Sequence, residues 1–199
     1  KIFLLGMLVA VPAIYLETFL EGFFSAFSLP RLGFLLLYFL IGIALVEEFL
    51  KYLVVRVGAL SNSALDEPLD VMLYMIVSGL GFAAFENILL LFGLIQTHPV
   101  SDVFLVNMIR FVQAVFLHAL ASGLLGYFLA LALFGKKHKW LFTLVGFSAA
   151  ILLHGLFNFY IFTIGNQNFP LLLLPVFPLF LIALFLSSRF RKLKNLKAT

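Results

Sequence analysis

The sequence predicts an all-α, polytopic membrane helix bundle with about six transmembrane helices. Of its 199 residues, 64% are hydrophobic and only 11% are charged. The mean hydropathy is +1.17. Soluble domains contain about 45–50% apolar and about 25% charged residues. Apolar runs of about 20 residues, the length that a helix needs to cross a bilayer, recur along the chain. This composition excludes a water-soluble fold.

The expected spans are apolar runs bounded by polar, glycine or proline residues. In order, they cover about 2–20, 32–57, 69–95, 103–134, 140–164 and 171–188. The first run contains Val11-Pro12-Ala13, a step typical of secretory signals, but its apolar character continues to Leu20, which favours a span. In the last run, Pro175 and Pro178 predict a kink. No repeat or linker separates the spans, so residues 1–199 are expected to form a single integral-membrane domain.

The distribution of positive charge predicts the orientation. Six spans place the N-terminus, the second and fourth loops and the C-terminal tail on one side of the membrane. The cations on that side are Lys1, Arg56, Lys136, Lys137, Lys139, Arg189, Arg191, Lys192, Lys194 and Lys197. The other side carries Arg31 alone, so both termini are expected to be cytoplasmic. The same clusters flank apolar runs, which favours lipid headgroups over nucleic acid as their partner.

Ionisable residues occur inside the expected spans, where they are costly. They are Glu47, Glu48 and Lys51 on the second span, Glu86 on the third, Arg110 and His118 on the fourth, and His154 on the fifth. Each formally charged group costs about 3 kcal/mol at the centre of a bilayer, or about 15 kcal/mol for all five. We therefore expect these side chains to face one another or a hydrated cavity. Arg110 alone has a second interpretation, because it lies near a span end from which it can snorkel.

Helical spacing supports this convergence. Glu47 and Lys51, and likewise His154 and Asn158, lie four residues apart and therefore share a helix face. Carboxylates, imidazoles and an amide in a water-poor cavity are the components of a hydrolytic site. One group removes a proton from water and another stabilises the oxyanion. An isolated ion pair within one helix is the structural alternative for Glu47 and Lys51.

Other classes of intramembrane hydrolase fit less well. The zinc-protease motif HExxH is absent, and the chain has no cysteine to act as a nucleophile. A pair of catalytic aspartates is excluded because Asp66, Asp70 and Asp102 lie at span ends. A serine mechanism is excluded less firmly, since Ser122 has His118 one turn away on its own helix.

Four motifs occur in order on successive spans. They are Glu47-Glu48-Phe49-Leu50-Lys51, Gly81-Phe82-Ala83-Ala84-Phe85-Glu86-Asn87, the lone His118, and His154-Gly155-Leu156-Phe157-Asn158. Each motif is weak by itself, but the ordered set over residues 40–160 resembles the PrsW family of intramembrane proteases. More distantly, it resembles the superfamily of CAAX-prenyl endopeptidases and bacteriocin-processing proteins.

The resemblance implies endopeptidase cleavage of a membrane-protein substrate, and for bacterial members cleavage of a single-span anti-sigma factor. It implies that Glu47 or Glu48 acts as the base, and that His154 and Asn158 hold the oxyanion. Where this chain has Glu86, the CAAX-type relatives have a histidine that helps to activate water. The residue that takes this role here is therefore not identified by the resemblance, and His118 is another source of an imidazole. The expected supporting residues are Lys51, Phe82, Asn87 and Arg110.

Three questions stay open at this stage. No cofactor is required, but two imidazoles beside carboxylates also suit zinc or another divalent metal. A non-catalytic membrane scaffold related to the family is an alternative function. A proton-coupled transporter is another, because intramembrane Glu and His residues also relay protons.

Overall fold

The computed structural model describes residues 1–59, 67–97, 100–135, 138–165 and 169–194. Within these ranges the chain is helical apart from short turns and contains no strand. Six segments are long and apolar enough to cross a membrane: Ile2–Ser25, Arg31–Gly58, Pro68–Gly93, Met108–Phe134, Lys139–Thr163 and Leu171–Lys194. The predicted multi-pass, all-α membrane protein is therefore confirmed, and each span lies within a few residues of its expected position.

The first span is helix α1 (Ile2–Ser25), which is longer than expected. The second is divided into α2 (Arg31–Leu37), the π-helix η1 (Tyr38–Leu45) and α3 (Val46–Gly58). The third and fourth are α4 (Pro68–Thr97) and α5 (Val100–Phe134). The fifth is α6 (Lys139–Tyr160), continued by the π-helix η2 (Ile161–Gly165). The sixth consists of α7 (Phe169–Leu173) and α8 (Val176–Lys194).

Two of these elements depart from a continuous α-helix. A turn at Leu174 and Pro175 separates α7 from α8, because proline lacks the amide that would continue the helix. This break confirms the predicted disturbance in the sixth span. The π-helix η1 was not predicted. It ends at Leu45, directly before Glu47 and Glu48, and π-helical turns inside α-helices are frequent at functional sites.

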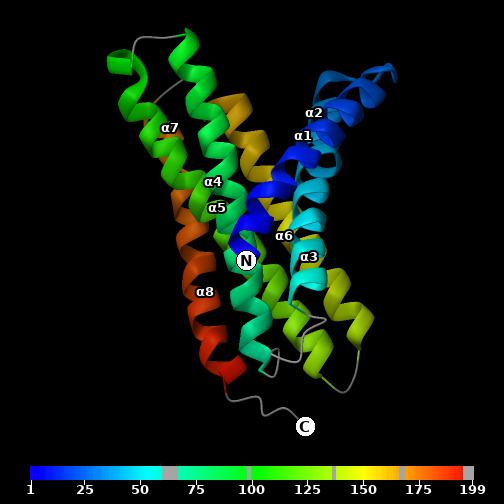
Figure 1. Cartoon of the computed structure of the whole chain (residues 1–199). Coiled ribbons are helices and arrows are strands. Elements are labelled where there is room, and N and C mark those ends of the chain that lie inside the picture. Colours follow the sequence, from blue (N-terminus) through cyan, green and yellow to red (C-terminus); the bar gives the residue numbers. More distant parts are fainter. Residues whose placement is uncertain (60–66, 98–99, 136–137, 166–168, 195–199) are drawn as a thin grey trace.

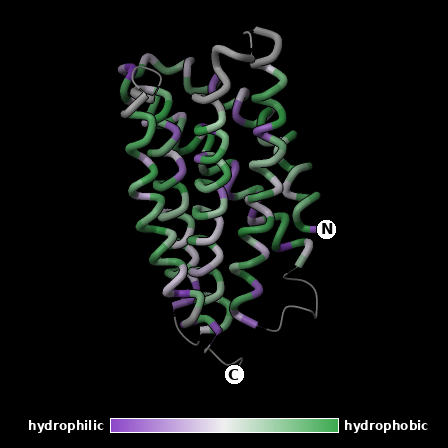
Figure 2. Tube along the Cα trace, turned by 90° about the vertical axis from the view of Figure 1, so that its left-hand side faces the viewer, coloured by the Kyte–Doolittle hydropathy of each residue, from purple (hydrophilic) through white to green (hydrophobic). Residues whose placement is uncertain are grey.

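Helix α5 forms the centre of the bundle and is the most buried span. It contacts α4, α6 and α8, while α1 crosses obliquely over α4 and α3 (Figure 1). In Figure 2 hydrophobic residues dominate the helices, and a few hydrophilic residues lie among them halfway along the bundle. The polar residues of four spans are therefore enclosed by apolar helix surfaces.

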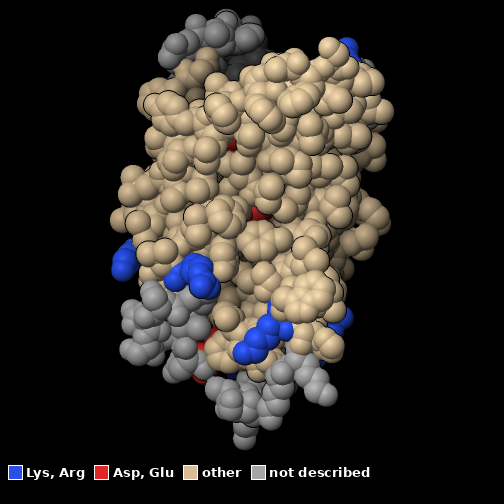
Figure 3. Space-filling model, turned by 90° about the vertical axis from the view of Figure 1, so that its right-hand side faces the viewer, with Lys and Arg blue, Asp and Glu red and all other residues tan. Residues whose placement is uncertain are grey.

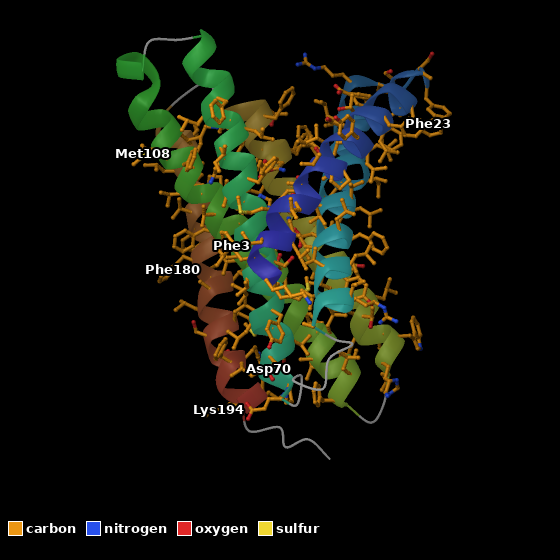
Figure 4. The ribbon with its side chains drawn as sticks, in the orientation of Figure 1. Phe3, Phe23, Asp70, Met108, Phe180 and Lys194 are labelled. Atoms are coloured by element: carbon orange, nitrogen blue, oxygen red, sulfur yellow. The ribbon has the colours of Figure 1, made fainter. Side chains whose placement is uncertain are left out.

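The outer surface of the bundle is apolar. Phe23, Met108 and Phe180 extend from three different helices away from the bundle (Figure 4), and their exposed fractions are 51%, 49% and 58%. Most of the Lys and Arg surface visible in Figure 3 lies in the lower half, toward the end where Lys194 is found (Figure 4). Positive charge thus gathers at the end of the bundle where the C-terminus lies, whereas the N-terminus lies halfway along it (Figure 1), and the cytoplasmic position of both termini stays a prediction. Lys136, Lys137 and Lys197 lie outside the described residues.

Glycine allows two helices to approach closely beside the polar residues. A Cβ atom at Gly79 of α4 would lie 2.5 Å from Ser122 Oγ and 2.8 Å from the carbonyl oxygen of His118, both on α5. A methyl group at this position therefore has to push α4 and α5 apart.

We expect Gly79→Ala to destabilise the protein by about 1–3 kcal/mol, the usual cost of overpacking a close contact. Thermal unfolding in detergent micelles measures this loss. Gly22→Ala is the matched control, because its Cβ would meet nothing within 4 Å and alanine favours the helix. Equal stability of the two variants would contradict the close approach of α4 and α5.

Candidate active site

Four helices contribute the polar side chains of one buried cluster. Glu47 and Glu48 lie in the first turn of α3, with Lys51 one turn later. Phe82 and Glu86 share a face of α4, and His118 and Ser122 share a face of α5. His154 comes from α6. The structure therefore brings together the residues that the sequence places on four separate spans.

Lys51 lies at the centre of the cluster and is fully buried. Its Nζ atom lies 3.1 Å from Glu47 Oε2, 2.8 Å from Glu48 Oε1 and 2.7 Å from His118 Nδ1. The ring of Phe82 covers the ammonium group, with its centroid 4.4 Å from Nζ. A lysine ammonium has three donors and no acceptor, so these three contacts satisfy it completely.

His118 connects this centre to Glu86. Since Lys51 can only donate, Nδ1 of His118 accepts, and the opposite ring nitrogen carries the hydrogen. That nitrogen, Nε2, donates to Glu86 Oε2 over 2.7 Å. A chain of hydrogen bonds thus runs from α3 through Lys51 and His118 to the carboxylate on α4.

His154 is oriented by Glu48. Its Nδ1 atom lies 2.9 Å from Glu48 Oε1, and Ser122 Oγ donates to the other carboxylate oxygen over 3.3 Å. The second ring nitrogen, Nε2, is buried and has no hydrogen-bond partner among the described residues. It faces Glu47 Oε2 at 3.7 Å, and the two imidazole rings lie edge to face with centroids 4.9 Å apart.

Glu47, His118 and His154 could hold a metal ion, since one ligand atom of each lies within 4.8 Å of the others. Two histidines and a glutamate are a known ligand set of catalytic zinc. Each imidazole also has its other nitrogen on a carboxylate, Glu86 or Glu48, which is how proteins orient histidine ligands. Together with the unpartnered His154 Nε2, these ligand atoms form a set that fits a divalent cation.

Lys51 limits this fit in one respect. Its ammonium group lies in hydrogen-bonding contact with Glu47 Oε2 and His118 Nδ1, the atoms that would hold the ion. The single lone pair of His118 Nδ1 cannot bind a metal ion and accept from Lys51 at once, so a bound ion would displace the Lys51 contact with this nitrogen. The remaining charges favour a cation, because a single lysine faces the carboxylates of Glu47, Glu48 and Glu86.

A cavity of about 400 Å³, lined by both polar and apolar residues, lies beside the cluster, between α4, α5 and α6. Its lining includes Glu86, Asn87, Arg110, Gln113 and Asn158. The Glu86 side chain is 46% exposed, whereas those of Glu47, Glu48, His118 and His154 are at most 4% exposed. Glu86 is therefore the carboxylate through which the buried cluster meets the cavity.

Three predicted site residues lie in the cavity wall rather than in the buried cluster. Asn158 and Asn87 line the cavity, and neither side chain has a hydrogen bond within the described part of the chain. Arg110 also lines the cavity and forms no ion pair with any described carboxylate. The expected pairing of Arg110 with an intramembrane carboxylate is therefore absent among the described residues, and snorkelling to the membrane surface stays a prediction. Ser122 bonds to Glu48 and not to a histidine, which removes support for a serine mechanism.

Two polar residues near the cluster were missed from the sequence. Glu17 of α1 is half-buried and interacts electrostatically with Glu47, Glu86 and Lys51. Its position within the first apolar run was the available signal. Ser78 of α4 donates to the carbonyl oxygen of Lys51 over 3.1 Å, which ties α4 to α3. No spacing rule points to this contact, because serine is common in membrane helices.

Comparisons with known proteins identify the family of the chain. A family model described as PrsW family intramembrane metalloprotease matches residues 1–185. The chain is 30% identical over 149 residues to Protease PrsW of Shouchella clausii, which covers 73% of this chain and 61% of that protein. It is 31% identical over 140 residues to Protease PrsW of Geobacillus kaustophilus, with coverages of 70% and 56%. The chain thus spans about three fifths of the length of these relatives. No solved structure matches it significantly.

Proposed function

Because the chain belongs to the PrsW family of intramembrane metalloproteases, we propose that it hydrolyses a peptide bond of a membrane-embedded protein substrate. The observation that carries this proposal is the Glu86–His118 pair, which joins a buried cluster of acids and imidazoles to the cavity inside the bundle. Such a cavity admits water and an unwound peptide to a position that lipid does not reach. A single-span membrane protein, such as an anti-sigma factor, is the substrate class that we propose.

In this proposal Glu86 is the general base. Its Oε2 atom accepts the hydrogen bond from His118, which fixes the carboxylate and leaves the other oxygen to take a proton from water in the cavity. The protonated Glu86 then returns the proton to the leaving amine. His118 is held in the required orientation by Lys51 on its opposite nitrogen. Asn158 lines the same cavity, and its amide supplies a donor for the oxyanion.

Glu47, His118 and His154 would hold a divalent metal ion in this site. When bound, such an ion polarises the scissile carbonyl and makes water more acidic. Glu48 is a positioning residue, because it acts through His154, whose ring it orients. Lys51 balances the charge of Glu47 and Glu48 and thereby keeps two carboxylates in an apolar bundle.

The purified protein tests this proposal in liposomes that contain candidate single-span substrates. We expect cleavage by the wild type, loss of cleavage after treatment with a strong chelator, and recovery when zinc is added back. Elemental analysis of the loaded protein should give one ion per chain. His154→Gln should lower the metal content well below this value, because it removes the unpartnered nitrogen.

A histidine outside the cluster provides the control. His138 precedes α6 with a φ of 59°, a left-handed conformation that asparagine tolerates, so His138→Asn should keep both the ion and the activity. Chelator-resistant cleavage would overturn the metal-assisted mechanism but not the protease. Failure of the wild type, loaded with zinc, to cleave any single-span substrate would overturn the protease itself.

A further inference from the structure

The cavity beside Glu86 contains polar groups that have no partner in the described part of the chain. Among these residues, Arg110 has no counter-ion, and the side-chain amides of Asn87 and Asn158 make no hydrogen bond. Gln113 Nε2 donates to the carbonyl oxygen of Leu172 over 2.7 Å, which anchors this wall of α5 to α7. The other end of the same side chain, Oε1, is buried without a donor among the described residues. A buried unpaired atom such as Gln113 Oε1 is costly inside a protein and indicates a missing partner, while Arg110, Asn87 and Asn158 line the cavity, where a ligand can reach them.

A peptide that is about to be cleaved within a membrane has backbone groups that require hydrogen-bond partners. Cleavage requires its helix to unwind, and the freed amide and carbonyl groups cost several kcal/mol each where neither water nor protein can bond to them. Amide side chains such as those of Asn87 and Asn158 both donate and accept, so they suit backbone groups of either kind. The cavity is therefore matched to an extended segment of peptide.

Arg110 adds a charge preference. It is the only Lys or Arg among the residues that line this cavity, and the one carboxylate in the same lining, Glu86, already accepts a hydrogen bond from His118. A guanidinium group in a partly desolvated site binds a carboxylate strongly, often through two parallel hydrogen bonds. No described residue pairs with Arg110, so this guanidinium group is available to a carboxylate of a bound substrate.

We propose that this cavity binds the unwound segment of the substrate beside the scissile bond and that Arg110 selects a segment with an aspartate or glutamate side chain. This inference rests on the proposed function and specifies its substrate. It makes Arg110 a specificity-determining residue in the cavity, distinct from Glu86 and Asn158, to which the proposed function assigns proton transfer and oxyanion binding. Asn87 and Asn158 bind the peptide backbone in the same cavity.

A charge-swap experiment in liposomes tests the proposal. A single-span peptide that the wild type cleaves is prepared as a series in which one Asp is moved, residue by residue, along both sides of the scissile bond. Matched series carry Asn or Lys at the same positions. For the wild type we expect at least one position at which the Asp peptide is cleaved about tenfold faster than the Asn peptide. At the same position the Lys peptide should be cleaved more slowly than the Asn peptide. For Arg110→Glu we expect the order of the cleavage rates at that position to reverse, so that the Lys peptide is cleaved fastest and the Asp peptide slowest.

Two further variants make the result interpretable. Arg31→Glu makes the same charge reversal at an exposed position in the first turn of α2, outside the cavity, and should keep the wild-type order. Arg110→Gln should cleave the Asp and Asn peptides at similar rates, and it serves as the test if the reversed charge impairs insertion. A parallel loss on all peptides by both Arg110 variants, in correctly inserted protein, would overturn the charge selection. Cleavage by the wild type without any preference would overturn it too, while leaving the protease in place.

Discussion

Glu86→Gln is expected to lower kcat by about 10²–10⁴-fold, the usual contribution of a positioned general base. The amide keeps the shape of the side chain and can still accept a hydrogen bond from His118, but it cannot take a proton from water. The cavity and the buried cluster should therefore persist while the chemical step is lost. Single-turnover cleavage in liposomes measures this step separately from product release.

Glu21→Gln is the matched control for this variant. Glu21 is an exposed acid on α1, outside the buried cluster and the cavity, so its amide should leave kcat unchanged. Glu86→His provides a positive test, because an imidazole can also accept a proton and a histidine occupies this position in the CAAX-type relatives that the chain resembles. We expect it to recover part of the activity that Glu86→Gln loses. Full activity of Glu86→Gln would refute the assignment of the base.

Lys51→Met is expected to destabilise the protein by about 3–5 kcal/mol, the usual cost of removing one partner of a buried ion pair. Methionine has a similar length, so packing against Phe82 is largely preserved. The loss comes from Glu47 and Glu48, which then lie buried without a counter-charge. Unfolding by heat or denaturant in mixed micelles measures the change in stability.

The double variant Lys51→Met with Glu48→Gln separates charge from packing. Removing one of the two uncompensated carboxylates should return part of the lost stability, so the two changes are expected to be strongly non-additive. Lys139→Met, at an exposed position at the start of α6, should have little effect. If the double variant were less stable than Lys51→Met alone, packing rather than charge would explain the loss.

The architecture was predictable because the bilayer constrains it so strongly. Only helices satisfy their own backbone groups in lipid, so the long apolar runs fixed the number of spans and their approximate bounds. The convergence of Glu47, Glu86, His118 and His154 followed from the cost of placing each of them in lipid. Simple depth estimates put Glu48 and His154 about 9 Å apart along the membrane normal, counted at a rise of about 1.5 Å per residue. In the structure the two side chains are nevertheless hydrogen-bonded, so this depth estimate was wrong about their separation.

The pairing within the site was not predictable. Spacing placed Glu47 and Glu48 on the same helix, but only their contacts distinguish them. Glu48 binds Lys51, His154 and Ser122, whereas Glu47 faces both imidazoles. The position of Arg110 likewise depends on how α4, α5 and α6 enclose a cavity. These details arise from tertiary packing, which a single sequence does not specify.

The π-helix η1 has a consequence for how relatives of this chain are compared. A π-turn accommodates one residue more than an α-turn, and one residue corresponds to about 100° of rotation around a helix axis. The residues of α2 are therefore rotated, relative to a continuous α-helix, with respect to the face of α3 that carries Glu47 and Lys51. A relative that lacks one residue within Tyr38–Leu45 would keep its acidic motif in place and turn the preceding helix instead. Insertions and deletions in this segment thus alter the surface presented to lipid while leaving the chemistry untouched.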